Sequence, residues 1–168
     1  YIPRRPTSWH RLIIVAKGLT IQKVYDVLPF SKTKWTERSL DSVVNFNWRT
    51  SKNGHYAIWV LDGDRPDESY LGRPAGDYNT REYCKRAQHF ITLLERLLLG
   101  HKYFDVTGKH LDMYYETICR GSGCITSDEA PIVGSYSERG KDEIYVASVT
   151  STSSYRRSGN RGVRAFLD

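Results

Sequence analysis

The sequence has few cysteines, and the three that it has include no CxxC pair. An odd number of scattered cysteines does not indicate a disulfide framework or a zinc site. Cys84 lies in a predicted helix, and Cys119 and Cys124 could pair only if the turn between them allowed it. We therefore expect mostly reduced thiols.

The sequence also lacks any hydrophobic run near the ~20 residues that a membrane helix needs, so we expect no membrane insertion by this domain. At 168 residues the chain fits one domain, 1–168, that is large enough to bury its own core. Because the chain begins at Tyr1 rather than Met, we expect a start residue, a tag or a disordered segment to be missing, a removed signal peptide is an alternative, and the localisation stays open.

No catalytic signature is present, since the sequence contains no Gly-x-Ser-x-Gly elbow, phosphate loop, HExxH or Rossmann fingerprint. An enzyme would have to use scattered groups such as His110, Asp112 and Cys119. We predict a protein that is not an enzyme and that uses no cofactor.

Metal-binding patterns are equally sparse. His101, His110 and Asp112 have no third strong ligand at a recognisable spacing, so we expect structural roles for them. Segment 63–77 is rich in Gly, Asp and Pro and predicts a loop. Its acidic residues do not have the spacing of an EF-hand calcium loop, so we predict a solvated loop without metal. The acidic residues in question are Asp62, Asp64, Asp67 and Glu68.

The net charge of +6 is not concentrated in one basic tract. Lys and Arg are interleaved with acidic residues along the chain. Pairs such as Arg4-Arg5 and Arg156-Arg157 are more typical of a solvated surface than of a track for phosphates. We predict no nucleic-acid partner.

The first half of the chain predicts two strands and two short helices. Apolar runs at 12–16 and 55–62 indicate strands, and the second is apolar on both faces, so it should be buried. Helical spacing of apolar residues predicts a helix over 20–28 that ends before Pro29. A second helix is predicted over 36–45, with Thr36 as its N-cap.

The clearest predicted helix begins at Asn79 with the capping pattern Asn79-x-x-Glu82. An apolar stripe runs to Leu98, and Gly100 is expected to end the helix. The stripe consists of Tyr83, Ala87, Phe90, Ile91, Leu94, Leu97 and Leu98. Beyond it, Lys109, His110 and Asp112 are expected to hold the crossing into 113–118 by hydrogen bonds or ion pairs.

The last third of the chain, 119–168, has no helical period. Short strands are predicted at 130–136, 143–150 and 162–167, between turns rich in Gly, Ser, Asp and Asn. In the middle strand Ile144 and Val146, with Ser148, should face a core. The opposite face and the following residues are rich in Ser, Thr and Tyr, which is typical of antibody-like binding surfaces. An ordinary solvated β-edge with a Ser-rich turn is the alternative interpretation.

Several short stretches carry a family resemblance: ITLLERLL at 91–98, YF at 103–104, TGKHLD at 107–112, CRGS at 119–122 and GVRA at 162–165. Together they resemble the variable proteins that diversity-generating retroelements diversify in bacteria, archaea and their viruses. The resemblance covers roughly residues 55–168. It implies an α+β, C-type lectin-like fold of the formylglycine-generating-enzyme branch. Two main helices would pack on antiparallel sheets, with an early strand paired to the last one and a loop-rich C-terminal third.

The resemblance divides the chain into a scaffold, 1–117, and a variable ligand-binding region, 118–168. Arg120, Ser122, Gly162 and Arg164 are assigned to the scaffold. The ligand would be a protein or glycan of unknown identity. The residues expected to contact it are Gly134, Ser135, Tyr136, Tyr145, Ala147, Ser148, Thr150, Ser151, Ser153, Tyr155 and Asn160.

The family mechanism restricts which residue types can vary. Replacing adenines in asparagine codons cannot produce Lys, Gln, Glu, Met or Trp. The charged residues Glu129, Glu138, Lys141 and Glu143 should therefore be fixed, and no Gln, Met or Trp follows Gly121. The tail lacks the Trp often found at the equivalent surface of the family, with Ser135 and Ser148 there instead.

A small enzyme or a nucleic-acid-associated domain is the alternative to a binding protein. Such a protein should show a concave pocket with perturbed titratable groups, or a basic face. The sequence leaves open the ligand, the oligomeric state and the compartment, and display on a surface or a virion would fit the resemblance.

Overall fold

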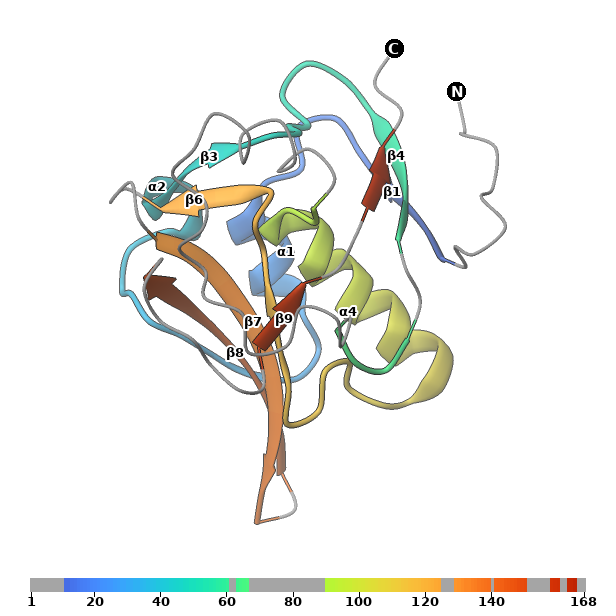
Figure 1. The fold of residues 1–168 in the computed structure, drawn as a ribbon, viewed down its shortest axis with the longest axis vertical. Helices are drawn as coiled ribbons and strands as arrows, with labels where there is room; N and C mark the ends of the chain where they lie inside the picture. Colours follow the sequence, from blue (N-terminus) through green and yellow to red (C-terminus); the bar gives the residue numbers. More distant parts are fainter. Residues whose placement is uncertain are drawn as a thin grey trace.

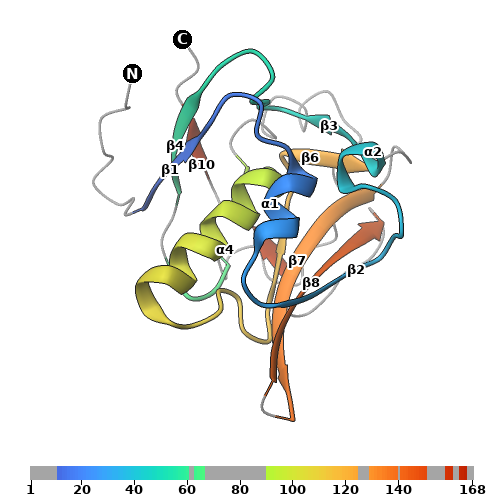
Figure 2. The same cartoon turned by 180° about the vertical axis from the view of Figure 1, so that it is seen from behind.

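The computed structural model describes residues 11–60, 63–66, 90–124, 129–139, 141–150, 158–160 and 163–165. These residues form a mixed α+β arrangement with three sheets. Figures 1 and 2 show the longest described helix, α4, between a three-stranded sheet and the long β7–β8 hairpin of a five-stranded sheet.

The three-stranded sheet has the order β1-β4-β10 and is antiparallel. Its strands are β1 (Arg11–Val15), β4 (Tyr56–Val60) and β10 (Val163–Ala165). The early and last strands were expected to pair with each other, but both pair with β4 instead. β4 takes the central place because it is apolar on both faces, as predicted, and Ile58 and Val60 are fully buried.

The five-stranded sheet has the order β2-β8-β7-β5-β9. Its strands are β2 (Ser31–Lys34), β5 (Glu116–Ile118), β7 (Glu129–Glu138), β8 (Lys141–Thr150) and β9 (Ser158–Asn160). The sheet is mixed rather than antiparallel as expected, since β2 pairs with β8, and β9 with β5, in parallel. The predicted strands at 130–136 and 143–150 are confirmed as β7 and β8, and Figure 1 shows their hairpin projecting from the molecule.

The predicted helix at 20–28 is confirmed as α1 (Ile21–Val27), with Thr20 as its N-cap. The prediction over 36–45 is wrong in extent, because α2 covers Leu40–Val43 and the chain then enters β3 (Val44–Asn47). β3 pairs with β6 (Ser122–Cys124), so ladder hydrogen bonds replace the helical ones that the pattern had suggested.

The long helix α4 spans Leu93–Thr107. Its start is a capping box in which Thr92 and Glu95 bond each other's backbone amides, and its end is Gly108 in the left-handed conformation, at φ 66°. The predicted start at Asn79 lies outside the described residues, but Phe90, Ile91 and Thr92 precede the helix rather than belonging to it.

Gly100, expected to end the helix, lies inside it. A Cβ there would sit 2.8 Å from Nη1 of the buried Arg96 side chain, so the absent side chain makes room for Arg96.

Two apolar clusters cover opposite faces of the five-stranded sheet. The main core joins α1, α4 and the three-stranded sheet to Val133, Ile144 and Val146 on the inner face. A smaller cluster on the outer face contains Ile118, Ile132, Val149, Ala130 and Ala147.

Among the described residues, no helix has the length and apolarity needed to cross a bilayer.

Candidate functional site

The outer face of the five-stranded sheet, which points away from α4, holds the tyrosines of the predicted site. Strand register and alternation assign fourteen described residues of β2, β5, β7 and β8 to this face. They are Ser31, Thr33, Glu116, Ile118, Ala130, Ile132, Gly134, Tyr136, Glu138, Lys141, Glu143, Tyr145, Ala147 and Val149. We call five residues in the half nearer the hairpin turn the tyrosine face: Glu116, Gly134, Tyr136, Glu143 and Tyr145.

Tyr145 is the centre of the tyrosine face. Its side chain crosses from β8 over β7 to β5, where its hydroxyl donates to Oε1 of Glu116 at 2.6 Å. Gly134 lies beneath the ring, and a Cβ there would stand 2.5 Å from Tyr145 Oη and 2.6 Å from Cζ. Burial, together with the bond to Glu116 and its charge, raises the pKa of Tyr145 above its ordinary value. The ring is therefore held in one orientation by a carboxylate and a glycine.

Tyr136 lies beside Tyr145, with ring centroids 5.8 Å apart and planes tilted by 49°. Both side chains are half-buried. Glu143 stands opposite Tyr136 in the register, and Glu138 is exposed toward the hairpin turn. The tyrosine face thus combines two aromatic rings with nearby carboxylates.

Three predicted contact residues have other roles. Gly134 lies on the outer face but is covered by the Tyr145 ring. Ser135 is on the inner face and 1% exposed, and its hydroxyl donates to the Leu111 carbonyl at 2.9 Å. Ser148 is half-buried on the same inner face, opposite Pro131. Gly134 and Ser135 are both buried, so neither presents a surface to solvent in this structure.

The half of the outer face farther from the hairpin turn is apolar and packed. Ala147 is half-buried against the smaller cluster formed by Ile118, Ile132 and Val149. We expected Ala147 to contact a ligand, but its methyl group packs against this cluster instead.

The remaining predicted contact residues follow β8. Thr150 ends β8 opposite Glu129, and Asn160 ends β9 beside Ile118, but the structure does not describe their side chains. Ser151, Ser153 and Tyr155 lie outside the described residues, as does the expected scaffold residue Gly162. Arg164 pairs through its backbone with Trp59 in the three-stranded sheet.

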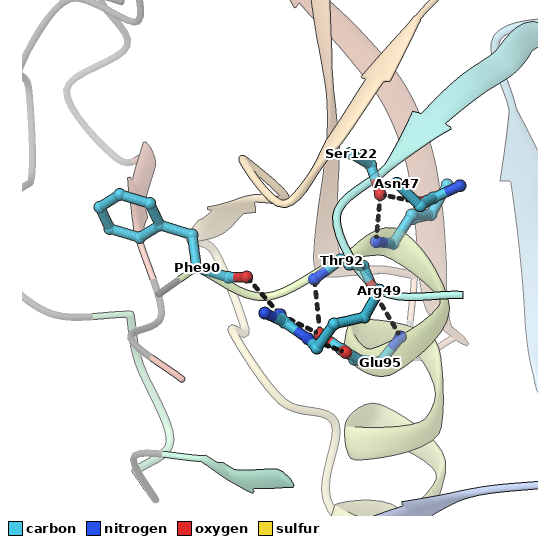
Figure 3. Close-up of polar contacts among 7 residues, drawn as sticks. Asn47, Arg49, Phe90, Thr92, Glu95 and Ser122 are labelled. Atoms are coloured by element: carbon cyan, nitrogen blue, oxygen red, sulfur yellow. Dashed lines mark hydrogen bonds and ion pairs between the residues drawn. The ribbon is translucent and has the colours of Figure 1, made fainter. Parts of the chain in front are cut away.

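A buried polar cluster ties the start of α4 to β3 and β6, as Figure 3 shows. The Arg49 guanidinium donates to both carboxylate oxygens of Glu95, at 2.6 Å and 2.8 Å, and to the Phe90 carbonyl at 2.6 Å. Ser122, assigned to the scaffold, accepts from the Leu93 amide at 2.9 Å and donates to Asn47 Oδ1. A bidentate pair with both charges buried holds its geometry tightly.

A second buried pair lies under the tyrosine face. Arg96 donates to Oδ2 of Asp112 at 3.1 Å and 2.7 Å, and Thr117 donates to the same oxygen at 2.5 Å. Asp112 has φ 58°, a left-handed conformation that its short polar side chain tolerates. This pair holds the turn that leads into β5 and hence the position of Glu116. The expected structural role of Asp112 matches this contact.

The two cysteines that the structure describes, Cys119 and Cys124, offer no reactive thiol. Cys119 and Cys124 are buried and unpaired with each other. Burial raises the pKa of Cys124 to about 12, and it raises the pKa of Cys119 as well. Neither group is a thiolate near neutral pH. Among the described residues no three His, Cys, Asp or Glu side chains are grouped to hold a metal ion.

Sequence reasoning missed Glu116 and the role of Gly134. No local signal marks Glu116, because its contact with Tyr145 depends on the register of three strands. For Gly134, a glycine inside an alternating strand was the available signal, since it indicates a close approach of another group.

No family model, curated protein or solved structure matches the chain.

Proposed function

We propose that this chain is a ligand-binding protein with a C-type lectin-like fold whose C-terminal surface is diversified by a retroelement. The tyrosine face would contact a protein or glycan target. The observation that carries the proposal is the pair Tyr136 and Tyr145, with the Tyr145 ring already held by Glu116 across Gly134.

An oriented tyrosine is well suited to binding. Tyr supplies a large contact area with only two side-chain torsions to order, so little conformational entropy is lost when a ligand arrives. The bond to Glu116 removes part of that loss before binding. Hot spots of interfaces are enriched in such aromatic anchors.

The proposal also requires that the fold tolerate substitution of the outward side chains of the five-stranded sheet. The two buried ion pairs, Arg49 with Glu95 and Arg96 with Asp112, lie away from the outward positions and involve residues before the variable region. The inner-face residues Val133, Ile144 and Val146 fill the core. Changes confined to outward side chains would leave these contacts intact.

The gene's own locus provides the test. A near-copy of the segment encoding residues ~121–165 should lie downstream, differing from the gene only where the copy has adenines. Differences should fall at the codons for Tyr136 and Tyr145 and spare those for Gly134 and Ser135. Absence of a copy and of a nearby reverse transcriptase, or differences spread evenly over inward and outward codons, would contradict the proposal.

A further inference from the structure

A cleft of about 420 Å³ lies on the other side of the hairpin, separate from the tyrosine face. It is formed where the end of α4, the turn at 110–115, the segment 63–66 and β8 meet. Its polar lining comes from His110, Asp142, Asp64, Arg65, Lys109 and three tyrosines. Its volume is within the range of small-molecule sites.

His110 forms a wall of this cleft, and its side chain is only 4% exposed. Phe30 and Phe104 hold its ring, each with a centroid 4.9 Å away. Nε2 stands 3.8 Å from Asp142 Oδ2, which is too far for a hydrogen bond, and no described group bonds Nδ1. Buried polar atoms in folded proteins nearly always have a partner, so Nδ1 calls for a ligand or water.

The imidazole is suited to a ligand that both donates and accepts. Burial lowers the pKa of His110, with the Asp142 charge acting against it, so the ring is neutral near pH 7. A neutral imidazole has one donor and one acceptor nitrogen. A hydroxyl group can accept a hydrogen bond from the donor nitrogen or donate one to the acceptor nitrogen.

Tyr114 presents an aromatic ring at the same cleft. It is 54% exposed, and its backbone has φ 64°, a conformation that a bulky residue rarely adopts. The turn is held from below, since the Tyr114 amide donates to the Ser135 carbonyl and the Tyr115 amide to the Asp112 carbonyl. Such fixed, unfavourable backbone conformations cluster at ligand clamps.

The charges of the lining balance. Asp64 and Asp142 stand against Arg65 and Lys109, and the Arg65 guanidinium covers the Tyr115 ring at 5.3 Å. A phosphate would meet the two carboxylates, and an ammonium ion would meet the two cations. A neutral molecule rich in hydroxyl groups would be repelled by neither pair of charges, and an apolar face of its ring could pack on Tyr114.

We propose that this cleft binds a neutral polyhydroxylated ligand, one pyranose unit, with its ring face on Tyr114 and its hydroxyls on His110 and Asp142. This site shares no residue with the tyrosine face.

The test is titration of the ¹⁵N-labelled full chain with the methyl pyranosides of glucose, galactose and mannose, followed by amide chemical shifts. We expect at least one to bind with a dissociation constant of about 1–10 mM, with shifts confined to the residues around the cleft, 63–66, 103, 108–115 and 141–143. Tyr114→Gly should weaken binding about tenfold without unfolding the chain, because glycine favours the φ of this position. Asp142→Asn should weaken it too, whereas Phe46→Ala, which removes an exposed ring elsewhere, should not.

Three outcomes would overturn the proposal. One is the absence of shifts with every pyranoside, and another is unchanged affinity in Tyr114→Gly. The third is tighter binding of inorganic phosphate or tetramethylammonium at the same amides, which would assign the cleft to a charged ligand.

Discussion

Gly134 has no side chain, and the ring of Tyr145 lies where its Cβ would be. The Tyr145 ring occupies the space that a Cβ would need, and the Tyr115 carbonyl stands 2.8 Å from the same point. The residue therefore works as a support for Tyr145 rather than as a ligand contact. At the residue scale, the function of a position follows from what its neighbours require.

Gly134→Ala should destabilise the protein by about 1–3 kcal/mol, because its methyl group would displace the Tyr145 ring and press on backbone. Gly123→Ala is the matched control in another strand, since its Cβ would meet Phe46 at an ordinary 3.6 Å. Urea unfolding of both variants measures the difference. Equal stabilities would show that the Tyr145 ring moves aside without penalty.

Asp112 is a second position defined by its neighbours. Replacing Asp112 with Asn keeps a residue that tolerates φ 58° but removes the charge that the buried Arg96 needs. We expect a loss of about 3–5 kcal/mol in unfolding free energy, as for one partner of a buried ion pair.

The control for this prediction is Asp105→Asn. Asp105 pairs with His101 at an exposed site, so its loss should change stability by less than about 1 kcal/mol. A small effect of Asp112→Asn in the same urea titration would mean that the Arg96 pair contributes little to the fold.

Among the elements, α4 shows why local patterns misjudge helix ends. Gly100 reads as a terminator, yet it lies inside the helix because Arg96 needs the space beside it. The true start, Thr92 with Glu95, and the true end, Gly108 after Thr107, both follow standard capping patterns. The sequence contains these capping signals, but the prediction followed the longer apolar stripe from Asn79 and placed the helix ends elsewhere.

The β7–β8 hairpin is an element whose turn can be improved. Glu138 pairs with Lys141, so two residues connect the strands, and Arg139 has φ 51°. Two-residue hairpin turns favour Asn-Gly, because asparagine accepts a positive φ. Arg139→Asn should therefore raise the unfolding free energy by about 0.5–1 kcal/mol in chemical denaturation. An unchanged or lower denaturation midpoint would contradict a strained Arg139.

At the scale of the whole molecule, one main core connects the three-stranded sheet to the five-stranded sheet through α4 and α1. Residues from Ile13 to Val146 contribute to it, so the tail strands β7 and β8 are part of the core on one face. Within 129–150, the residues expected to contact a ligand therefore lie on the same strands that supply core residues.

The stability of the whole fold should depend on pH through His110. Burial lowers the pKa of this group below its ordinary 6.5, so below that pH the unfolded chain binds more protons than the folded one. The unfolding free energy should be at its full value above pH ~6.5 and fall as the pH drops from there toward the lowered pKa. Denaturation at pH values from about 7.5 to 5 measures this slope.

His110→Phe is the comparison for the pH dependence. A phenyl ring can pack between Phe30 and Phe104 without a titrating group, so the decline below pH ~6.5 should become shallower. If the variant follows the wild-type curve, another group is responsible for the acid sensitivity.

The sequence by itself determined the elements whose signals are local. The helix α1 followed from the helical spacing of its apolar residues and from Pro29, and the strands β7 and β8 followed from alternation between turn residues. The tertiary structure alone decided which strands pair and in what register. Because a shift of one residue reverses the face of every side chain in a strand, that register determined that Ser135 enters the core while Tyr145 reaches Glu116. No short-range pattern encodes this, since the residues involved lie far apart in the chain and meet only when the sheet has formed.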